Sequence, residues 1–265
     1  ILNSIDSMKN IYFLYRDSSN FLSIKQQLDS LYVSLFPIQK KFIRQFIQKY
    51  DTSFASLIAL YSSIGKERIL NPNEDYYFFF LVDKGLMKNH PKSKHTIEYH
   101  KKFIEIEQEH KERKIIEAKL SIGNYAPDIT LNSIDNKQYS ISQFKGKNLL
   151  IQFWSSSCKP CRNINSQLNH LYSKLKKHNT EIYFISIDDN YQDWMYSSKQ
   201  DNIKWINVSD LMGWNSPVVK IYNIQGVPTN FLIDTNGIII AKNISINELK
   251  NKLISNNSNK KLTKK

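Results

Sequence analysis

A single tetrapeptide is the feature that most constrains how this chain can fold. Cys158-Lys159-Pro160-Cys161 contains both cysteines of the 265 residues, and it comes shortly after an apolar run that ends in Trp154. An apolar run bounded by turn residues predicts a buried strand, and Pro160 suits the first turn of a helix, where its missing N–H costs nothing. The sequence therefore predicts a strand, a short turn and a helix, with Cys158 at or beside the helix N-cap.

This arrangement activates one thiol and keeps the other behind it. The positive end of a helix dipole and the unpaired N–H groups of an N-cap favour a thiolate at Cys158. Lys159 adds a positive charge and should lower the pKa of that thiol further below its usual value of about 8.5. The tetrapeptide therefore predicts thiol-disulfide exchange.

A Cys-X-X-Cys pair also occurs in zinc sites and in structural disulfides. A structural zinc site needs four ligands, but no second pair of cysteines or histidines with the required spacing follows, and His170 supplies at most a third ligand. A disulfide across so short a loop removes little entropy from the unfolded chain. We therefore expect neither a metal site nor a purely structural disulfide.

Four of the six histidines are close in sequence, at positions 90, 95, 100 and 110. Steps of five and ten residues direct side chains to different sides of a helix, whereas paired ligands on a helix are three or four residues apart. We therefore expect these histidines to lie on a solvated face and not around a metal ion.

The formal charge of +13 comes from 37 Lys and Arg residues against 24 Asp and Glu residues. The lysines are spread through most of the chain, which predicts a solvated basic surface and no dedicated nucleic-acid site.

No apolar stretch is long enough for a membrane span, and we expect the densest one, residues 76–82, to be core. Residues 259–265 are expected to be a frayed basic tail, and because the sequence starts at Ile1 without a leader we expect a processed or trimmed product.

The first half of the chain shows helical periodicity. From about residue 20 to 118, apolar residues recur every three or four positions. One stripe runs from Ile24 to Leu35, Pro37 interrupts it, and a second stripe runs from Ile38 to Tyr50. Both predict helix faces directed at a core, so we expect an all-α domain over residues 1–120.

Residues 121–258 change to strands and turns. The apolar runs 149–154 and 182–187 are separated by a predicted helix that begins at the cysteines. Continuous apolar runs are typical of strands covered on both faces, and this strand-helix-strand spacing implies a right-handed parallel crossover. A hairpin over residues 231–241 and a closing helix complete the predicted α/β domain.

Four motifs of this second half occur in a characteristic order. They are residues 123–128 (GNYAPD), 142–147 (SQFKGK), 154–161 (WSSSCKPC) and 226–229 (GVPT). With these motifs, about residues 122–255 resemble the thioredoxin superfamily, and within it the TlpA/ResA-like thiol-disulfide oxidoreductases found outside the bacterial cytoplasm. The resemblance implies a thioredoxin-like fold, in which helices flank a central mixed sheet. It also implies a preceding helical region, often with a small β domain and a secretion signal further upstream.

The resemblance also implies the roles of single residues. Cys158 attacks a substrate disulfide as a thiolate, and Cys161 resolves the mixed disulfide. Pro228 corresponds to the family's cis-proline beside the disulfide, and the backbone of Val227 pairs with an extended substrate segment. Trp154 is expected both to pack and to cover the thiols. The implied partners are a disulfide-containing protein and a dithiol electron donor, with no cofactor, in a periplasmic or otherwise extracytoplasmic compartment.

Two residues depart from the family pattern. Thioredoxin has a buried Asp at the position of Gln152, and some relatives carry a Glu at about the position of Asn132; both are amides here. A carboxylate at either position is a candidate acceptor for the proton of Cys161. We therefore expect resolution to depend on water or on another residue, and exchange to be slower.

Two alternative functions stay open. Related peroxiredoxins use Pro-X3-Thr/Ser-X2-Cys, in which Ser155 fits the second position but Ile151 replaces the proline. In the other alternative, the helical domain binds a partner and the cysteines serve as a redox tether. The direction of electron flow depends on the reduction potential of the cysteine pair, and the family resemblance favours reduction of the substrate.

Overall fold

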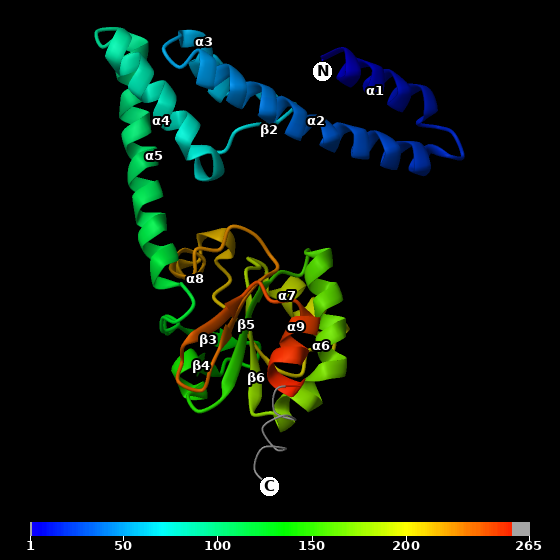
Figure 1. Ribbon diagram of the computed structural model, residues 1–265. Helices are drawn as coiled ribbons and strands as arrows, with labels where there is room; N and C mark the ends of the chain where they lie inside the picture. The colour runs from blue at the N-terminus through cyan, green and yellow to red at the C-terminus, as the bar shows by residue number, and fades with distance from the viewer. Residues whose placement is uncertain (1, 256–265) are drawn as a thin grey trace. The chain divides into compact units, whose positions relative to one another are not determined.

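The computed structural model describes residues 2–255, so the basic tail predicted over residues 259–265 lies outside the described residues. The chain divides into two compact units, Ile1–Glu112 and Arg113–Lys265 (Figure 1). The first is helical and the second contains a large sheet. The domain boundary predicted between residues 120 and 121 stays a prediction.

The first unit consists of helices and one very short hairpin. Ser53 and Asn71 cap two of the helices by accepting hydrogen bonds from backbone amides, as expected for these residue types. Its core is formed by apolar side chains of four helices and of the hairpin segment, with Ile47, Val82 and Leu86 fully buried. The elements are α1 (Leu2–Tyr15), α2 (Phe21–Lys49), α3 (Phe54–Leu60), β1 (Ser63–Ile64), β2 (Glu67–Arg68), α4 (Pro72–Asn89) and α5 (Lys94–Lys119), which continues into the second unit.

Helix α2 differs from the prediction because it continues through Pro37. The carbonyl that Pro37 leaves without its usual amide partner belongs to Val33, whose side chain is 65% exposed, so solvent can satisfy it. Leu31, Ile38 and Phe42 are also more than half exposed. Their assignment to a core face was therefore wrong, whereas Leu28, Ile43 and Ile47 are buried.

The predicted solvated histidine face is wrong for two of the four histidines. The Nδ1 atom of His100 lies 2.9 Å from a carboxylate oxygen of Asp83, on α4. The ring of His110 stacks on that of Tyr76, with 3.9 Å between the ring centroids. Helix α4 lies alongside α5 and supplies both partners, which the spacing of the histidines could not reveal.

The second unit is a seven-stranded mixed sheet with the strand order β4-β3-β7-β6-β5-β8-β9. β5, β6 and β7 are parallel, and the other neighbours pair antiparallel. The strands are β3 (Thr130–Ser133), β4 (Gln138–Ser140), β5 (Asn148–Trp154), β6 (Thr180–Ser186), β7 (Ile206–Ser209), β8 (Thr229–Ile233) and β9 (Ile239–Lys242). The helices are α6 (Lys159–Lys177), α7 (Tyr191–Gln200), α8 (Pro217–Ile221) and α9 (Ile246–Lys250), with short helical turns at Ile141–Phe144, Gly213–Asn215 and Asn251–Ser255.

Each face of the sheet carries its own core. Ile151 and Phe153 of β5 enter one core, while Leu150 and Trp154 enter the other, together with Cys161 and Leu168 of α6. This alternation is the period of two expected of a strand buried on both faces. The predicted fold, a thioredoxin-like mixed sheet flanked by helices after a helical region, is confirmed.

Candidate active site

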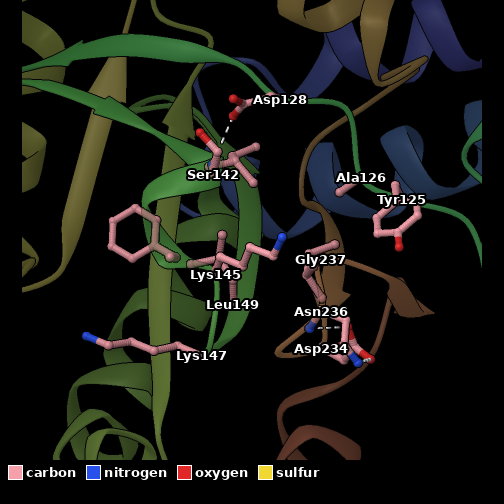
Figure 2. Close-up of a pocket in the computed structure, with 13 residues that line it drawn as sticks. Tyr125, Ala126, Asp128, Ser142, Lys145, Lys147, Leu149, Asp234, Asn236 and Gly237 are labelled. Carbon is pink, nitrogen blue, oxygen red and sulfur yellow. Dashed lines mark hydrogen bonds between the residues drawn. The ribbon is translucent and has the colours of Figure 1, made fainter.

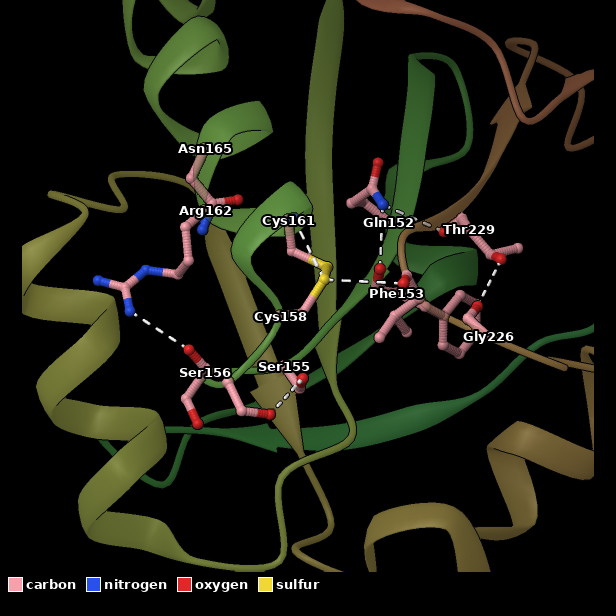
Figure 3. Close-up of a disulfide and its surroundings, with 12 residues drawn as sticks. Gln152, Phe153, Ser155, Ser156, Cys158, Cys161, Arg162, Asn165, Gly226 and Thr229 are labelled. Atoms are coloured by element: carbon pink, nitrogen blue, oxygen red, sulfur yellow. Dashed lines mark hydrogen bonds between the residues drawn. A yellow bond between two sulfur atoms is a disulfide. The ribbon is translucent and has the colours of Figure 1, made fainter. Parts of the chain in front are cut away.

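The sheet topology brings together two segments that are far apart in the sequence. β5 is followed by the loop that leads to Cys158, and β8 runs antiparallel to β5 with Thr229 paired to Phe153. The start of β8 therefore lies beside the end of β5. Just before β8, the peptide bond between Val227 and Pro228 is cis, as predicted. The Sγ atom of Cys158 lies 3.7 Å from the carbonyl oxygen of Val227 (Figure 3).

Cys158 is the N-cap residue of α6, as predicted. Its Sγ atom accepts a hydrogen bond from the amide of Cys161 at a distance of 3.1 Å. An amide that points at this sulfur stabilises a thiolate, and the helix dipole acts in the same direction. The two cysteines are joined by a disulfide; Cys161 is 1% exposed, whereas Cys158 is only partly buried. Lys159 and Pro160 form the exposed first turn of α6.

The loop between β5 and α6 is held by charged groups that the sequence analysis missed. Asp188, just after β6, accepts hydrogen bonds from the amide and the hydroxyl of Ser156, at 3.0 and 2.7 Å. Arg162 donates to the carbonyl oxygen of Ser156 at 3.3 Å and pairs with Asp201. A signal for Asp188 was present: it follows a predicted parallel strand, and the carboxyl ends of parallel strands meet at one edge of a sheet.

Gln152 is buried on the same face of β5 as Trp154, with 1% of its surface exposed. Its Nε2 atom donates to the carbonyl oxygens of Phe153 and Thr229, at 3.0 and 3.2 Å. Its Oε1 atom accepts from the side-chain amide of Asn230 at 3.3 Å. The hydrogen-bond partners of Gln152 are therefore neutral groups that do not ionise near neutral pH.

Replacing Gln152 by Glu is expected to destabilise the second unit by about 1 to 3 kcal/mol at pH 7, because a carboxylate there would face two carbonyl oxygens. Burial and these oxygens raise the pKa of the new acid above its unfolded value of about 4.3. The loss is therefore small below about pH 4 and grows as the pH rises through the raised pKa. Tryptophan fluorescence in urea measures it, and Gln143→Glu, at an exposed position, is the control. Equal effects of the two changes would contradict this account of Gln152.

Trp154 and Asn132 are the other two positions that the sequence singled out. Trp154 is 0% exposed, and its Nε1 atom donates to the side-chain oxygen of Asn207 at 3.1 Å. Its packing role is confirmed: Trp154 and Cys161 belong to one apolar cluster, and Cys158 packs against that cluster. The expected role of Trp154 as a cover over the thiols stays a prediction. Asn132 is exposed on β3, which β7 and β6 separate from β5. Of the two amide positions, only Gln152 lies on the strand that leads to the cysteines.

A separate cavity of about 190 Å³ lies at the other end of β5. Leu149, near the start of that strand, contributes to its wall, whereas Cys158 follows the end of the strand. Figure 2 shows Lys145 extending across this cavity toward Gly237. The cavity is therefore not part of the candidate active site. Within residues 2–255, no group of three or more His, Cys, Asp or Glu side chains is arranged to hold a metal ion.

Comparisons with known proteins match this second unit. Residues 122–242 match a family model described as the AhpC/TSA family. The thiol-disulfide oxidoreductase ResA of Bacillus thuringiensis subsp. konkukian (strain 97-27) is 32% identical over 126 residues, which are 48% of this chain and 71% of that protein. ResA of Geobacillus kaustophilus (strain HTA426) is 29% identical over 118 residues, or 44% and 66% of the two chains. Among solved structures, the thioredoxin domain of a thiol-disulfide oxidoreductase from Bacteroides vulgatus is 31% identical, has a TM-score of 0.48, and covers 51% of this chain and 97% of that chain.

The sequence and the structure agree with these matches. The ordered motifs, the mixed sheet and the Cys-X-X-Cys pair at a helix N-cap all lie within the matched region. The ResA match at 32% identity extends over more than two thirds of that relative. The chain therefore belongs to the ResA-like thiol-disulfide oxidoreductases of the thioredoxin superfamily.

Proposed function

We propose that this oxidoreductase reduces disulfide bonds of other proteins outside the cytoplasm, with Cys158 as the nucleophile. The observation that carries the proposal is the asymmetry of the pair. Cys158 is partly exposed and accepts an amide hydrogen bond at the N-terminus of α6, whereas Cys161 is 1% exposed. An attacking thiolate needs access and stabilisation, and a resolving thiol needs only to reach its neighbour.

The proposed reaction has two exchange steps. The Cys158 thiolate bonds to one sulfur of the substrate disulfide, whose S–S bond breaks, and the first substrate sulfur leaves as a thiolate that takes up a proton. Cys161 then loses its proton and attacks the Cys158 sulfur, which releases the second substrate sulfur. The substrate has gained two electrons, and the Cys158–Cys161 disulfide waits for a dithiol donor. Since neutral groups surround Gln152, water is the proposed acceptor for the proton of Cys161.

The loop before β8 is the proposed binding place for the substrate chain. Val227 and Pro228 are half-buried, and the carbonyl oxygen of Val227 lies 3.7 Å from the Cys158 sulfur. An extended segment that pairs with the backbone of Val227 would hold its own cysteine at this distance from the nucleophile. Lys159 and Pro160 are exposed and follow Cys158 directly, and they are proposed to flank the substrate.

The proposal is tested with insulin as the disulfide substrate and dithiothreitol as the donor. We expect the whole chain to accelerate insulin reduction, and its potential, equilibrated with glutathione, to lie nearer that of thioredoxin, about −270 mV, than that of DsbA, about −120 mV. No acceleration, with no equilibration with glutathione, would overturn the assignment. A potential near that of DsbA would instead reverse the proposed direction of electron flow.

One observation favours a second candidate function, in which the helical unit binds a partner. Large apolar side chains on α1 and α2 are exposed, among them Phe13 at 62%, Leu14 at 75% and Leu22 at 76%. Exposed apolar residues in such numbers are typical of interaction surfaces. Within residues 2–255, no helix combines the length and apolar composition needed to cross a bilayer. A partner that stays bound when both cysteines are replaced by serine would support this candidate.

A further inference from the structure

The active-site loop is held by hydrogen bonds at one residue, Ser156, which lies two positions before Cys158. Two charged side chains bind this residue from different sides. On one side, the carboxylate of Asp188 accepts three side-chain and backbone donors: the amide of Ser156, its hydroxyl, and the hydroxyl of Ser186 at 2.6 Å. Asp188 is 8% exposed. On the other side, Arg162 donates to the carbonyl oxygen of Ser156. Figure 3 shows this guanidinium reaching the backbone of Ser156.

Arg162 also ties the loop to helix α7. Its Nε atom pairs with Asp201, its Nη1 atom donates to the hydroxyl of Ser197 at 3.3 Å, and its Nη2 atom donates to Gln200 at 3.1 Å. Asn165, which is 0% exposed, donates to the same carboxylate of Asp201 at 2.7 Å. Arg162, which follows Cys161, is thus held by α7 and in turn holds Ser156, two residues before the nucleophile.

We propose that Asp188 and Arg162 are positioning residues that set the redox equilibrium of the Cys158–Cys161 pair by holding Ser156, and with it the Cys158 sulfur, in one place. The inference rests on the proposed function, in which this pair exchanges electrons with other thiols. Neither residue touches the sulfurs in the contacts described, so both act through the loop and through their charges.

Two physical effects connect these contacts to the equilibrium. A loop that holds the two thiols of the reduced pair close together raises their effective concentration and favours the disulfide. The charges around the sulfur, which are Lys159, Arg162, Asp188 and Asp201, decide how stable the thiolate of the reduced pair is. Removing Asp188 loosens the loop and removes a negative charge, and both changes favour the reduced form. Removing Arg162 loosens the loop but also removes a positive charge, so its two effects oppose each other.

The test equilibrates the whole chain with glutathione, in which two glutathione molecules become one glutathione disulfide as the pair becomes a dithiol. We expect Asp188→Asn to shift this equilibrium about fivefold toward the dithiol, which corresponds to about 20 mV for a two-electron couple. Ultraviolet absorbance of the thiolate against pH should show a lower pKa for Cys158. The matched control is Asp189→Asn, which removes the same charge one residue later from an exposed side chain. It should shift the equilibrium less than twofold.

Two variants of Arg162 distinguish a role through position and charge from a merely structural role. Arg162→Gln should raise the pKa of Cys158, the opposite of Asp188→Asn, and Arg162→Lys should restore it because the charge is kept. If Asp188→Asn does not fold, as judged by circular dichroism, Ser156→Ala tests the same contact, because it removes the hydroxyl that donates to Asp188. It should shift the equilibrium toward the dithiol by less than Asp188→Asn would.

The outcomes separate this inference from the proposed function. If the wild-type pair does not exchange with glutathione, the proposed function fails first. If the wild-type pair exchanges but Asp188→Asn matches Asp189→Asn, or Arg162→Gln moves the pKa of Cys158 in the same direction as Asp188→Asn, the positioning role is refuted. An unchanged equilibrium in folded Ser156→Ala also refutes it.

Discussion

Replacing Cys158 by Ser is expected to abolish insulin reduction, with a fall of about 1,000-fold or more in the catalysed rate. The reason is chemical: a serine hydroxyl is not ionised near neutral pH and does not exchange with a disulfide. The fold should persist, because Ser is a good N-cap residue and can accept the hydrogen bond that the Cys161 amide now donates to sulfur. Unchanged far-UV circular dichroism would separate lost chemistry from lost structure.

The matched variant, Cys161→Ser, is expected to behave differently. It keeps the partly exposed nucleophile and removes the 1% exposed resolving thiol, so mixed disulfides through Cys158 should accumulate. Non-reducing electrophoresis and mass spectrometry of the adducts measure this. Adducts through Cys161 in the Cys158→Ser protein, and none in the Cys161→Ser protein, would invert the assigned roles.

The parts of the fold that followed from the sequence depend on short-range patterns. The runs at residues 149–154 and 182–187 are apolar apart from Gln152 and Ser186 because β5 and β6 are covered on both faces, and that pattern is visible without a structure. The N-cap position of Cys158 followed from Pro160 in the same way. Where burial depends on packing, periodicity failed: the outer face of α2 repeats apolar residues such as Ile38 and Phe42, yet both are 59% exposed.

The same distinction between short-range patterns and packing applies to the candidate site. The two cysteines and the cis-proline were found because each lies in a short motif, and the antiparallel pairing of β5 with β8 then brings the motifs together. The contacts that hold Ser156 were missed because its two charged partners lie just after β6 and on α6, and Arg162 is held in turn by Asp201. Contacts that depend on how three elements pack leave no local signature in one sequence. The hydrogen bond that holds the Trp154 ring was missed for the same reason, since its acceptor, Asn207, lies on β7.

The helical unit contains the ion pairs expected to matter most for its stability. The Asp75 side chain is 0% exposed; its carboxylate accepts from Arg44 Nε at 3.0 Å, from the amide of Asn71 at 2.9 Å, and lies 3.1 Å from Lys40. Burial alone raises the pKa of this carboxyl, but the Asn71 amide, Arg44 and Lys40 together outweigh it and hold the pKa below its usual value of 3.8. The charged form of Asp75 is therefore the one that stabilises the fold.

Replacing Asp75 by Asn is expected to destabilise the helical unit by about 2 to 4 kcal/mol at pH 7, because it leaves two cations without their buried partner. The expected loss of stability is smaller than that for a fully buried ion pair because the Arg44 side chain is 41% exposed. Far-UV circular dichroism in urea measures the loss. All four tryptophans lie at or after Trp154, in the second unit, so the fluorescence transition should not move. Glu74→Gln is the control, since Glu74 also pairs with Lys40 but is 69% exposed, and it should cost less than about 0.5 kcal/mol.

The difference in the free energy of unfolding between the wild-type protein and Asp75→Asn depends on pH, and the sign of this dependence can be stated. Because the folded pKa of Asp75 is lowered, its stabilisation is complete above the unfolded pKa of about 3.9 and is lost as the pH falls through the lower folded value. The gap between the wild-type protein and Asp75→Asn should therefore stay constant from pH 7 to about pH 5 and shrink at more acidic pH. Asp83, in the same unit, has its pKa raised mainly by burial and titrates in the opposite sense, but it is present in both proteins and cancels in the difference. A gap that widens as the pH falls would show that the Asp75 carboxylate is not the stabilising form.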